Sequence, residues 1–95
     1  MRLMTKALAK KIPKLYSTEK IPVEDKIAVA KYFLPMSRWT WYVVEGEEAP
    51  DGDWLFFGYV EGLEKEWGYF HEPLFAERDL HFKPTKMADI TRRND

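Results

Sequence analysis

The sequence contains no cysteine and no long apolar run. The absence of thiols excludes a disulfide framework, a thiolate nucleophile and a zinc–thiolate site. No apolar stretch approaches the roughly 20 residues that a membrane helix needs. The basic start of the chain also lacks the apolar core and the small-residue cleavage site of a signal peptide. We therefore expect a cytoplasmic protein with no membrane partner.

Glycine is scarce, and its five residues are spread among expected turns and strands instead of forming a phosphate-binding loop. The clearest chemical cluster is a short stretch with His71, His81 and the acids Glu72, Glu77 and Asp79. Such a cluster is compatible with metal binding or acid–base catalysis. Its spacing matches no metal-ligand motif, so solvated side chains are the favoured interpretation. We expect no catalytic residues, no metal and no cofactor.

The whole chain carries no large excess of either charge, and its net charge is −1. The distribution is nevertheless uneven. Residues 1–20 carry six bases and one acid, whereas residues 45–79 carry eleven acids and two bases. Residues 80–95 are again slightly basic. An acidic centre between basic ends bears on the choice of partner more than on the fold.

Aromatic residues are abundant, and ten of the fifteen lie between residues 39 and 70. Aromatic and β-branched runs separated by Gly, Pro and Asp are typical of antiparallel strands. Strands are expected at 26–34, 38–45, 54–61 and 67–71, with a short fifth strand at 80–83. The short connections between them predict a meander.

The N-terminal segment predicts a helix capped by Thr5. Its apolar stripe consists of Met4, Leu8, Ile12 and Leu15. A last helical turn, capped by Thr85, is expected to include Met87 and Ile90. The chain therefore predicts one α+β domain over residues 1–95, a twisted antiparallel sheet of four to five strands with the N-terminal helix packed on one face. One short helix cannot cover two aromatic faces, so we expect exposed rings or a homodimer.

The meander brings the loop after the second strand and the segment after the fourth strand to the same end of the sheet. The candidate partner-binding residues at this acidic end are Glu47, Glu48, Asp51, Asp53, Trp54, Glu72, Glu77, Arg78 and Asp79. Glu45 is expected among these acids. Carboxylates beside aromatic rings suit a basic protein surface, such as the nucleic-acid groove of another protein. A surface that only improves solubility is the alternative. For Arg78, a structural hydrogen-bonding role is favoured over recognition.

Nucleic acid is the second candidate partner. Exposed rings on a sheet can stack bases, and Lys6, Lys10 and Lys14 offer contacts to phosphate. The aromatic block is acidic, however, and nucleic-acid affinity comes largely from neutralised phosphates. Nucleic-acid binding therefore ranks below protein binding, and a small enzyme ranks third.

Several segments resemble a family of small bacterial proteins known as domain of unknown function 2958. The resemblance covers roughly residues 1–86 and is strongest at 39–42 (WTWY), 57–60 (FGYV), 66–70 (EWGYF) and 77–80 (ERDL). Residues 71–76 are shorter than the Leu- and Gly-rich insertion usual in the family. Members are often carried by plasmids, integrated elements and phages. No established activity comes with the family. Together with the acidic surface, carriage by mobile elements favours a non-catalytic inhibitor or decoy that occupies a host or defence protein, in the manner of an anti-CRISPR protein.

Overall fold

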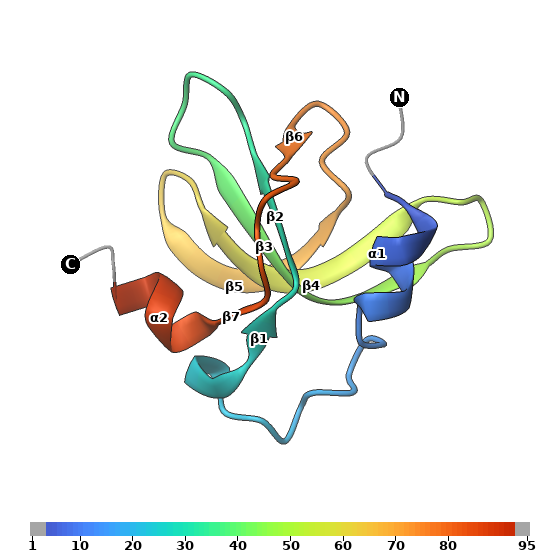
Figure 1. Ribbon diagram of the computed structural model, residues 1–95, viewed down its shortest axis with the longest axis horizontal. Helices are drawn as coiled ribbons and strands as arrows, with labels where there is room; N and C mark the ends of the chain where they lie inside the picture. Colours follow the sequence, from blue (N-terminus) through green and yellow to red (C-terminus); the bar gives the residue numbers. More distant parts are fainter. Residues whose placement is uncertain (1–3, 93–95) are drawn as a thin grey trace.

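The computed structural model describes residues 4–92 and is built around a five-stranded antiparallel sheet (Figure 1). The strand order is β5-β4-β3-β2-β6. The strands are β2 (Ala30–Phe33), β3 (Thr40–Glu48), β4 (Trp54–Glu61), β5 (Lys65–His71) and β6 (Glu77–Arg78). Strands β2 to β5 form a meander, and β6 returns to pair with β2. The predicted α+β class with an antiparallel meander is confirmed.

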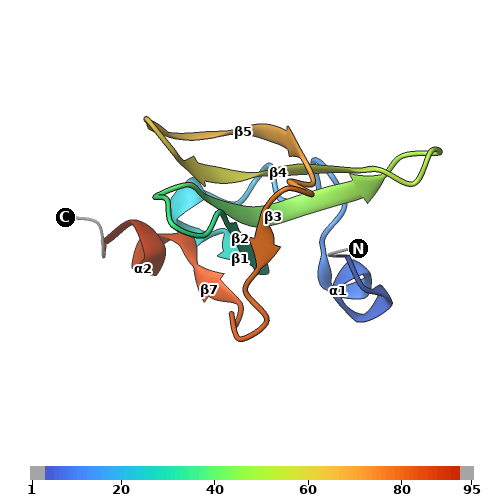
Figure 2. The ribbon, with the colours of Figure 1, turned by 90° about the horizontal axis from the view of Figure 1, so that it is seen from above.

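Two short helices and a separate two-stranded ladder complete the described part of the chain. The helices are α1 (Lys6–Lys11) and α2 (Met87–Arg92), and the ladder consists of β1 (Ile27–Ala28) and β7 (Thr85–Lys86). A 3₁₀ turn, η1 (Val23–Asp25), precedes β1. Strand β1 pairs with β7. Figure 2 shows α1 and α2 near opposite ends of the sheet. Within residues 4–92, no helix has the length and apolar character required to span a bilayer.

Helix α1 packs on one face of the sheet, as the sequence predicts. The Thr5 hydroxyl caps the helix by accepting the Leu8 backbone N–H at 3.1 Å. Leu8 and Ile12 are buried in a cluster that includes Tyr32 and Phe56. The helix has only six residues, because Ile12 is already extended ahead of a proline.

The other face is covered by elements that the sequence analysis underestimated. Tyr42 and Val44 pack with Met87 and Ile90 of α2 and with Ala28 of β1. The burial of Met87 and Ile90 in a C-terminal helix is as predicted. We expected exposed rings or a second copy on the face that α1 leaves uncovered, whereas α2 and the β1–β7 ladder supply a second layer there.

A β-bulge in β3 alters the expected alternation of side chains. The register with β4 shifts between Val43 and Glu45, so that Val43 pairs with Gly58 and Glu45 pairs with Phe57. The additional residue, Val44, turns the Glu45 side chain toward the face of the sheet that carries Phe57. Glu45 is buried, which corrects the expectation that it belongs to the exposed acidic end.

The strands expected at 38–45 and 67–71 are present with shifted bounds, as β3 and β5, whereas two other expected strands differ more. The strand expected at 26–34 is interrupted at Val29, whose N–H donates to the Val43 carbonyl at 2.8 Å and thereby joins β3. The strand expected at 80–83 is wrong. A turn begins there because the Asp79 carboxylate accepts the His81 N–H at 2.9 Å. Thr85 lies in β7 and does not cap α2, and its hydroxyl donates to the Lys83 carbonyl.

Candidate functional site

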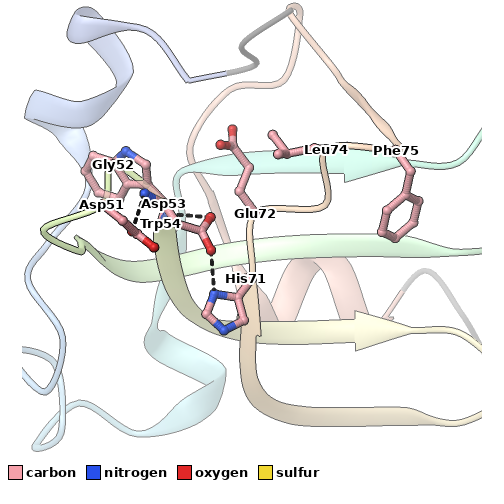
Figure 3. A pocket seen from close by; sticks show the side chains of 8 residues that line it. All are labelled: Asp51, Gly52, Asp53, Trp54, His71, Glu72, Leu74 and Phe75. Atoms are coloured by element: carbon pink, nitrogen blue, oxygen red, sulfur yellow. Dashed lines mark hydrogen bonds and ion pairs between the residues drawn. The ribbon is translucent and has the colours of Figure 1, made fainter.

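An open hollow of about 430 Å³ lies beside the turn between β3 and β4. We call it the acidic hollow, and its lining residues are Asp51, Gly52, Asp53, Trp54, His71, Glu72, Leu74 and Phe75. Figure 3 shows that they come from two segments: the β3–β4 turn with the start of β4, and the end of β5 with the loop that follows it. The hollow thus combines three carboxylates with three large apolar side chains.

Short-range hydrogen bonds fix the aspartates of the turn. The Asp51 carboxylate accepts the Asp53 N–H at 2.9 Å, and the Asp53 carboxylate accepts the Trp54 N–H at 2.8 Å. The second Asp53 oxygen lies 3.0 Å from Nδ1 of His71, which forms an ion pair when the histidine is protonated (Figure 3). Both partners are solvent-accessible, so this pair orients the turn more than it stabilises the fold.

A hydrogen bond from a buried tyrosine holds Glu72 in place. The Tyr32 hydroxyl donates to Glu72 Oε2 at 2.8 Å. Burial raises the pKa of Tyr32 strongly, and the hydrogen bond to Glu72 and its negative charge add to the rise. The positive charge of Arg78 opposes it. Tyr32 therefore stays a neutral donor that holds the Glu72 carboxylate at the hollow.

An apolar hollow of about 280 Å³ adjoins the acidic one through a shared residue. Its lining residues are Leu34, Trp39, Trp41 and Phe75. Trp39 stacks on Trp41 with ring centroids 5.8 Å apart, and Phe75 meets Trp41 edge to face at 5.6 Å. Phe75 is 70% exposed. Because Phe75 lines both hollows, they lie next to each other, one acidic and the other aromatic, and we call the pair the acidic–aromatic groove.

The structure brings four of the nine predicted site residues into this groove, namely Asp51, Asp53, Trp54 and Glu72. Glu47 and Glu48 are exposed at the end of β3, where they pair with Leu55 and Trp54 on the same hairpin. They flank the groove without lining it.

The remaining three predicted residues, Glu77, Arg78 and Asp79, lie elsewhere. They belong to β6 or directly follow it, at the opposite edge of the sheet from β5. Asp79 lines a different hollow together with His81 and Lys31. Their expected position at the acidic end is wrong, because residues 72–76 carry the chain across the sheet before β6 begins. Strand β6 pairs with β2, with Arg78 opposite Tyr32, so this segment forms one edge of the sheet.

Sequence reasoning missed Leu74 and Phe75, which stand 60% and 70% exposed in the loop after β5. Two consecutive large apolar residues after a proline, outside any strand pattern, were the available signal. The interpretation of His71 and His81 as one cluster fails on geometry, since they border separate hollows. In the part of the chain that the structure describes, no three His, Asp or Glu side chains are arranged to hold a metal ion.

Comparisons with protein-family models, with curated proteins and with solved structures found no match to this chain. The resemblance to the family of unknown function stays a prediction.

Proposed function

We propose that this protein is a non-catalytic binding module whose acidic–aromatic groove receives a basic segment of another protein. In keeping with the family resemblance, the partner is a host protein, and the module is an inhibitor or decoy carried by a mobile element. The observation that carries the proposal is that the acidic hollow and the aromatic hollow meet at Phe75. Three carboxylates and an exposed aromatic wall share one surface through Phe75.

The charges favour a cationic partner. Asp51, Asp53 and Glu72 line one end of the groove, and Glu47 and Glu48 extend the negative field along the same hairpin. Carboxylates gathered on one surface attract Lys and Arg and steer association at low salt. A nucleic acid would be repelled by the same field.

The apolar end favours a partner that also carries an aliphatic or aromatic anchor. Leu74 and Phe75 are mostly exposed, and Phe75 meets buried Trp41 edge to face. Large exposed apolar side chains gathered around a hollow are typical of a protein interface. The expected ligand is therefore a segment with several Lys or Arg residues next to one Leu or similar side chain.

A peptide titration tests this proposal. The first probe is a fluorescein-labelled peptide with four Lys or Arg residues around one Leu, and the second replaces that Leu by Ser. Fluorescence anisotropy measures both affinities. We expect the Leu peptide to bind tighter by roughly tenfold, because one apolar anchor is buried in the aromatic end.

Two variants locate the binding surface. Asp51→Lys reverses a charge within the groove, whereas Glu64→Lys makes the same change in net charge at an exposed site between β4 and β5. We expect Asp51→Lys to lower the affinity for the Leu peptide on the order of fivefold more than Glu64→Lys does. Equal effects of the two variants, or equal affinity of the two peptides, would contradict the proposal.

A further inference from the structure

A further hollow, with a different chemistry, lies away from the acidic–aromatic groove. Its volume is about 240 Å³, and its lining residues are Tyr16, Glu19, Lys26, Glu45, Phe57 and Tyr69. None of these residues lines the groove. The hollow presents three aromatic rings and two carboxylates, so we call it the tyrosine cage.

The sheet register brings two of the rings together. Glu45 on β3 pairs with Phe57 on β4, and Phe57 pairs with Tyr69 on β5, so the three side chains form a row on one face. The rings of Phe57 and Tyr69 lie 5.1 Å apart at an interplanar angle of 55°. Two walls set at an angle result, and β4 and β5 hold them rigidly.

The third wall comes from the segment that follows α1. The ring of Tyr16 lies 6.1 Å from that of Tyr69 at 51°. Tyr16 has a backbone φ of 69°, a left-handed conformation that is uncommon for a residue with a Cβ atom. Such conformations persist where the surrounding structure enforces them, and they concentrate at binding sites.

Buried Glu45 enforces this conformation. Its carboxylate accepts the Tyr16 N–H at 2.7 Å, the Thr18 N–H at 2.9 Å and the Thr18 hydroxyl. Buried Lys26 donates to the Thr18 carbonyl and, at 3.1 Å, to its hydroxyl. Both Glu45 oxygens therefore already accept hydrogen bonds, and the negative charge of the carboxylate lies at the cage.

The field in the cage is negative. Two carboxylates, Glu45 and Glu19, line it against the single ammonium of Lys26. The pKa of Tyr69 is raised by partial desolvation, by its hydrogen bond with Tyr16 and by the negative charges around it, including Glu45 and Glu19. The faces of the rings add their own negative potential.

We infer that the tyrosine cage binds a methylated ammonium group, such as the quaternary nitrogen of choline or of trimethyllysine. Rings set at angles around a hollow attract such cations through their π faces. An unmethylated ammonium is strongly hydrated and loses more on entering an aromatic hollow than a methylated one does, and both Glu45 oxygens already accept other hydrogen bonds. Tyr16 and Tyr69 remain 60% and 52% exposed, which leaves the cage open to a ligand.

The test is an NMR titration of the full chain with choline and with 3,3-dimethyl-1-butanol, its neutral isostere. We expect choline to shift the amide resonances around Tyr16, Phe57 and Tyr69 and to bind roughly tenfold tighter than the isostere. A peptide with one trimethyllysine, compared with the same peptide with lysine, then separates the two sources of the group. Tighter binding of either methylated probe than of its control supports the inference. Equal binding within both pairs would overturn it.

Matched variants guard against non-specific binding. Tyr69→Leu removes one wall at a half-exposed site, and Phe75→Leu removes an exposed ring from the acidic–aromatic groove. Thermal unfolding confirms that each variant is folded. The inference requires roughly a tenfold loss of choline affinity for Tyr69→Leu and none for Phe75→Leu. Unchanged affinity in Tyr69→Leu would refute the cage, whereas the peptide titration of the groove would be unaffected.

Discussion

The Glu45 carboxylate accepts the backbone N–H of Tyr16 at 2.7 Å, although 29 residues separate them. This bond fastens the segment after α1 to the middle of β3. Glu45 and Lys26 are the two buried charged residues in the described part of the chain, and both form hydrogen bonds with Thr18. A small network of charged groups therefore fixes the position of the N-terminal segment on the sheet.

Removing the charge of Glu45 is expected to be costly. Glu45→Gln places an amide N–H₂ against a backbone N–H donor, because one Glu45 oxygen accepts from Tyr16 and the other accepts from Thr18. We expect a loss of about 2–4 kcal/mol in the free energy of unfolding by urea. Glu47→Gln is the matched control at an exposed site two residues away and should change stability by less than about 0.5 kcal/mol. Similar losses in both variants would argue against the buried network.

Two paired glycines provide a second contrast. A Cβ atom at Gly58 would lie 1.8 Å from the Tyr42 carbonyl oxygen, whereas one at Gly68 meets nothing within 4 Å. The backbone of β3 must move to accept Gly58→Ala, so we expect a loss of more than ~3 kcal/mol. Gly68→Ala should be neutral or stabilise by up to about 1 kcal/mol, because alanine restricts the unfolded chain. Chemical denaturation of both variants checks the close approach of β3 and β4.

The docking of α1 is tested by Leu8→Ala. Leu8 is buried against the sheet, and its truncation leaves a cavity under a six-residue helix. The free energy of unfolding should fall by about 2–5 kcal/mol. Lys10→Ala changes an exposed position of the same helix and serves as the control. A loss below about 0.5 kcal/mol for Leu8→Ala would mean that α1 does not pack as described.

Tyr32 makes stability sensitive to alkaline pH. Burial and Glu72 raise its pKa in the folded protein, whereas the unfolded chain releases the proton near the ordinary value of 10.0. The resulting stability is complete below pH 10 and is lost as the pH rises beyond it. Tyr32→Phe should cost about 1 kcal/mol at neutral pH through the lost hydrogen bond, and should lose less stability than the wild type between pH 9 and about pH 11. Parallel pH dependence in the two proteins would be inconsistent with a proton held on Tyr32.

Much of the sheet was predictable from local pattern. Strand β4 has the predicted bounds, Trp54–Glu61, because dense aromatic residues follow a strong turn signal. Strand β6 was missed, because two residues carry no periodicity and pair only through the long-range position of β2. The bulge at Val44 was equally invisible, and with it the burial of Glu45.

The candidate site was predictable only where connectivity alone brings residues together. Asp51, Asp53, Trp54 and Glu72 meet because β4 begins and β5 ends at the same end of the sheet. The positions of Leu74 and Phe75 depend on how the loop after β5 crosses the sheet. The ring of Tyr16 depends on its left-handed backbone and on the bond to Glu45, neither of which has a sequence signal.

The most direct test of the binding function is the salt dependence of a triple charge reversal, Glu47, Glu48 and Asp51 to Lys. The control reverses Glu24, Glu64 and Glu66, three exposed acids that do not line the groove. Stopped-flow association with the basic Leu peptide and with a single-stranded DNA oligonucleotide is measured over a range of salt concentrations. We expect the groove variant, and not the control, to associate more slowly with the peptide and with a flatter salt dependence. Faster and tighter binding of DNA by the groove variant, together with unchanged peptide association, would contradict the account and favour nucleic acid as the partner.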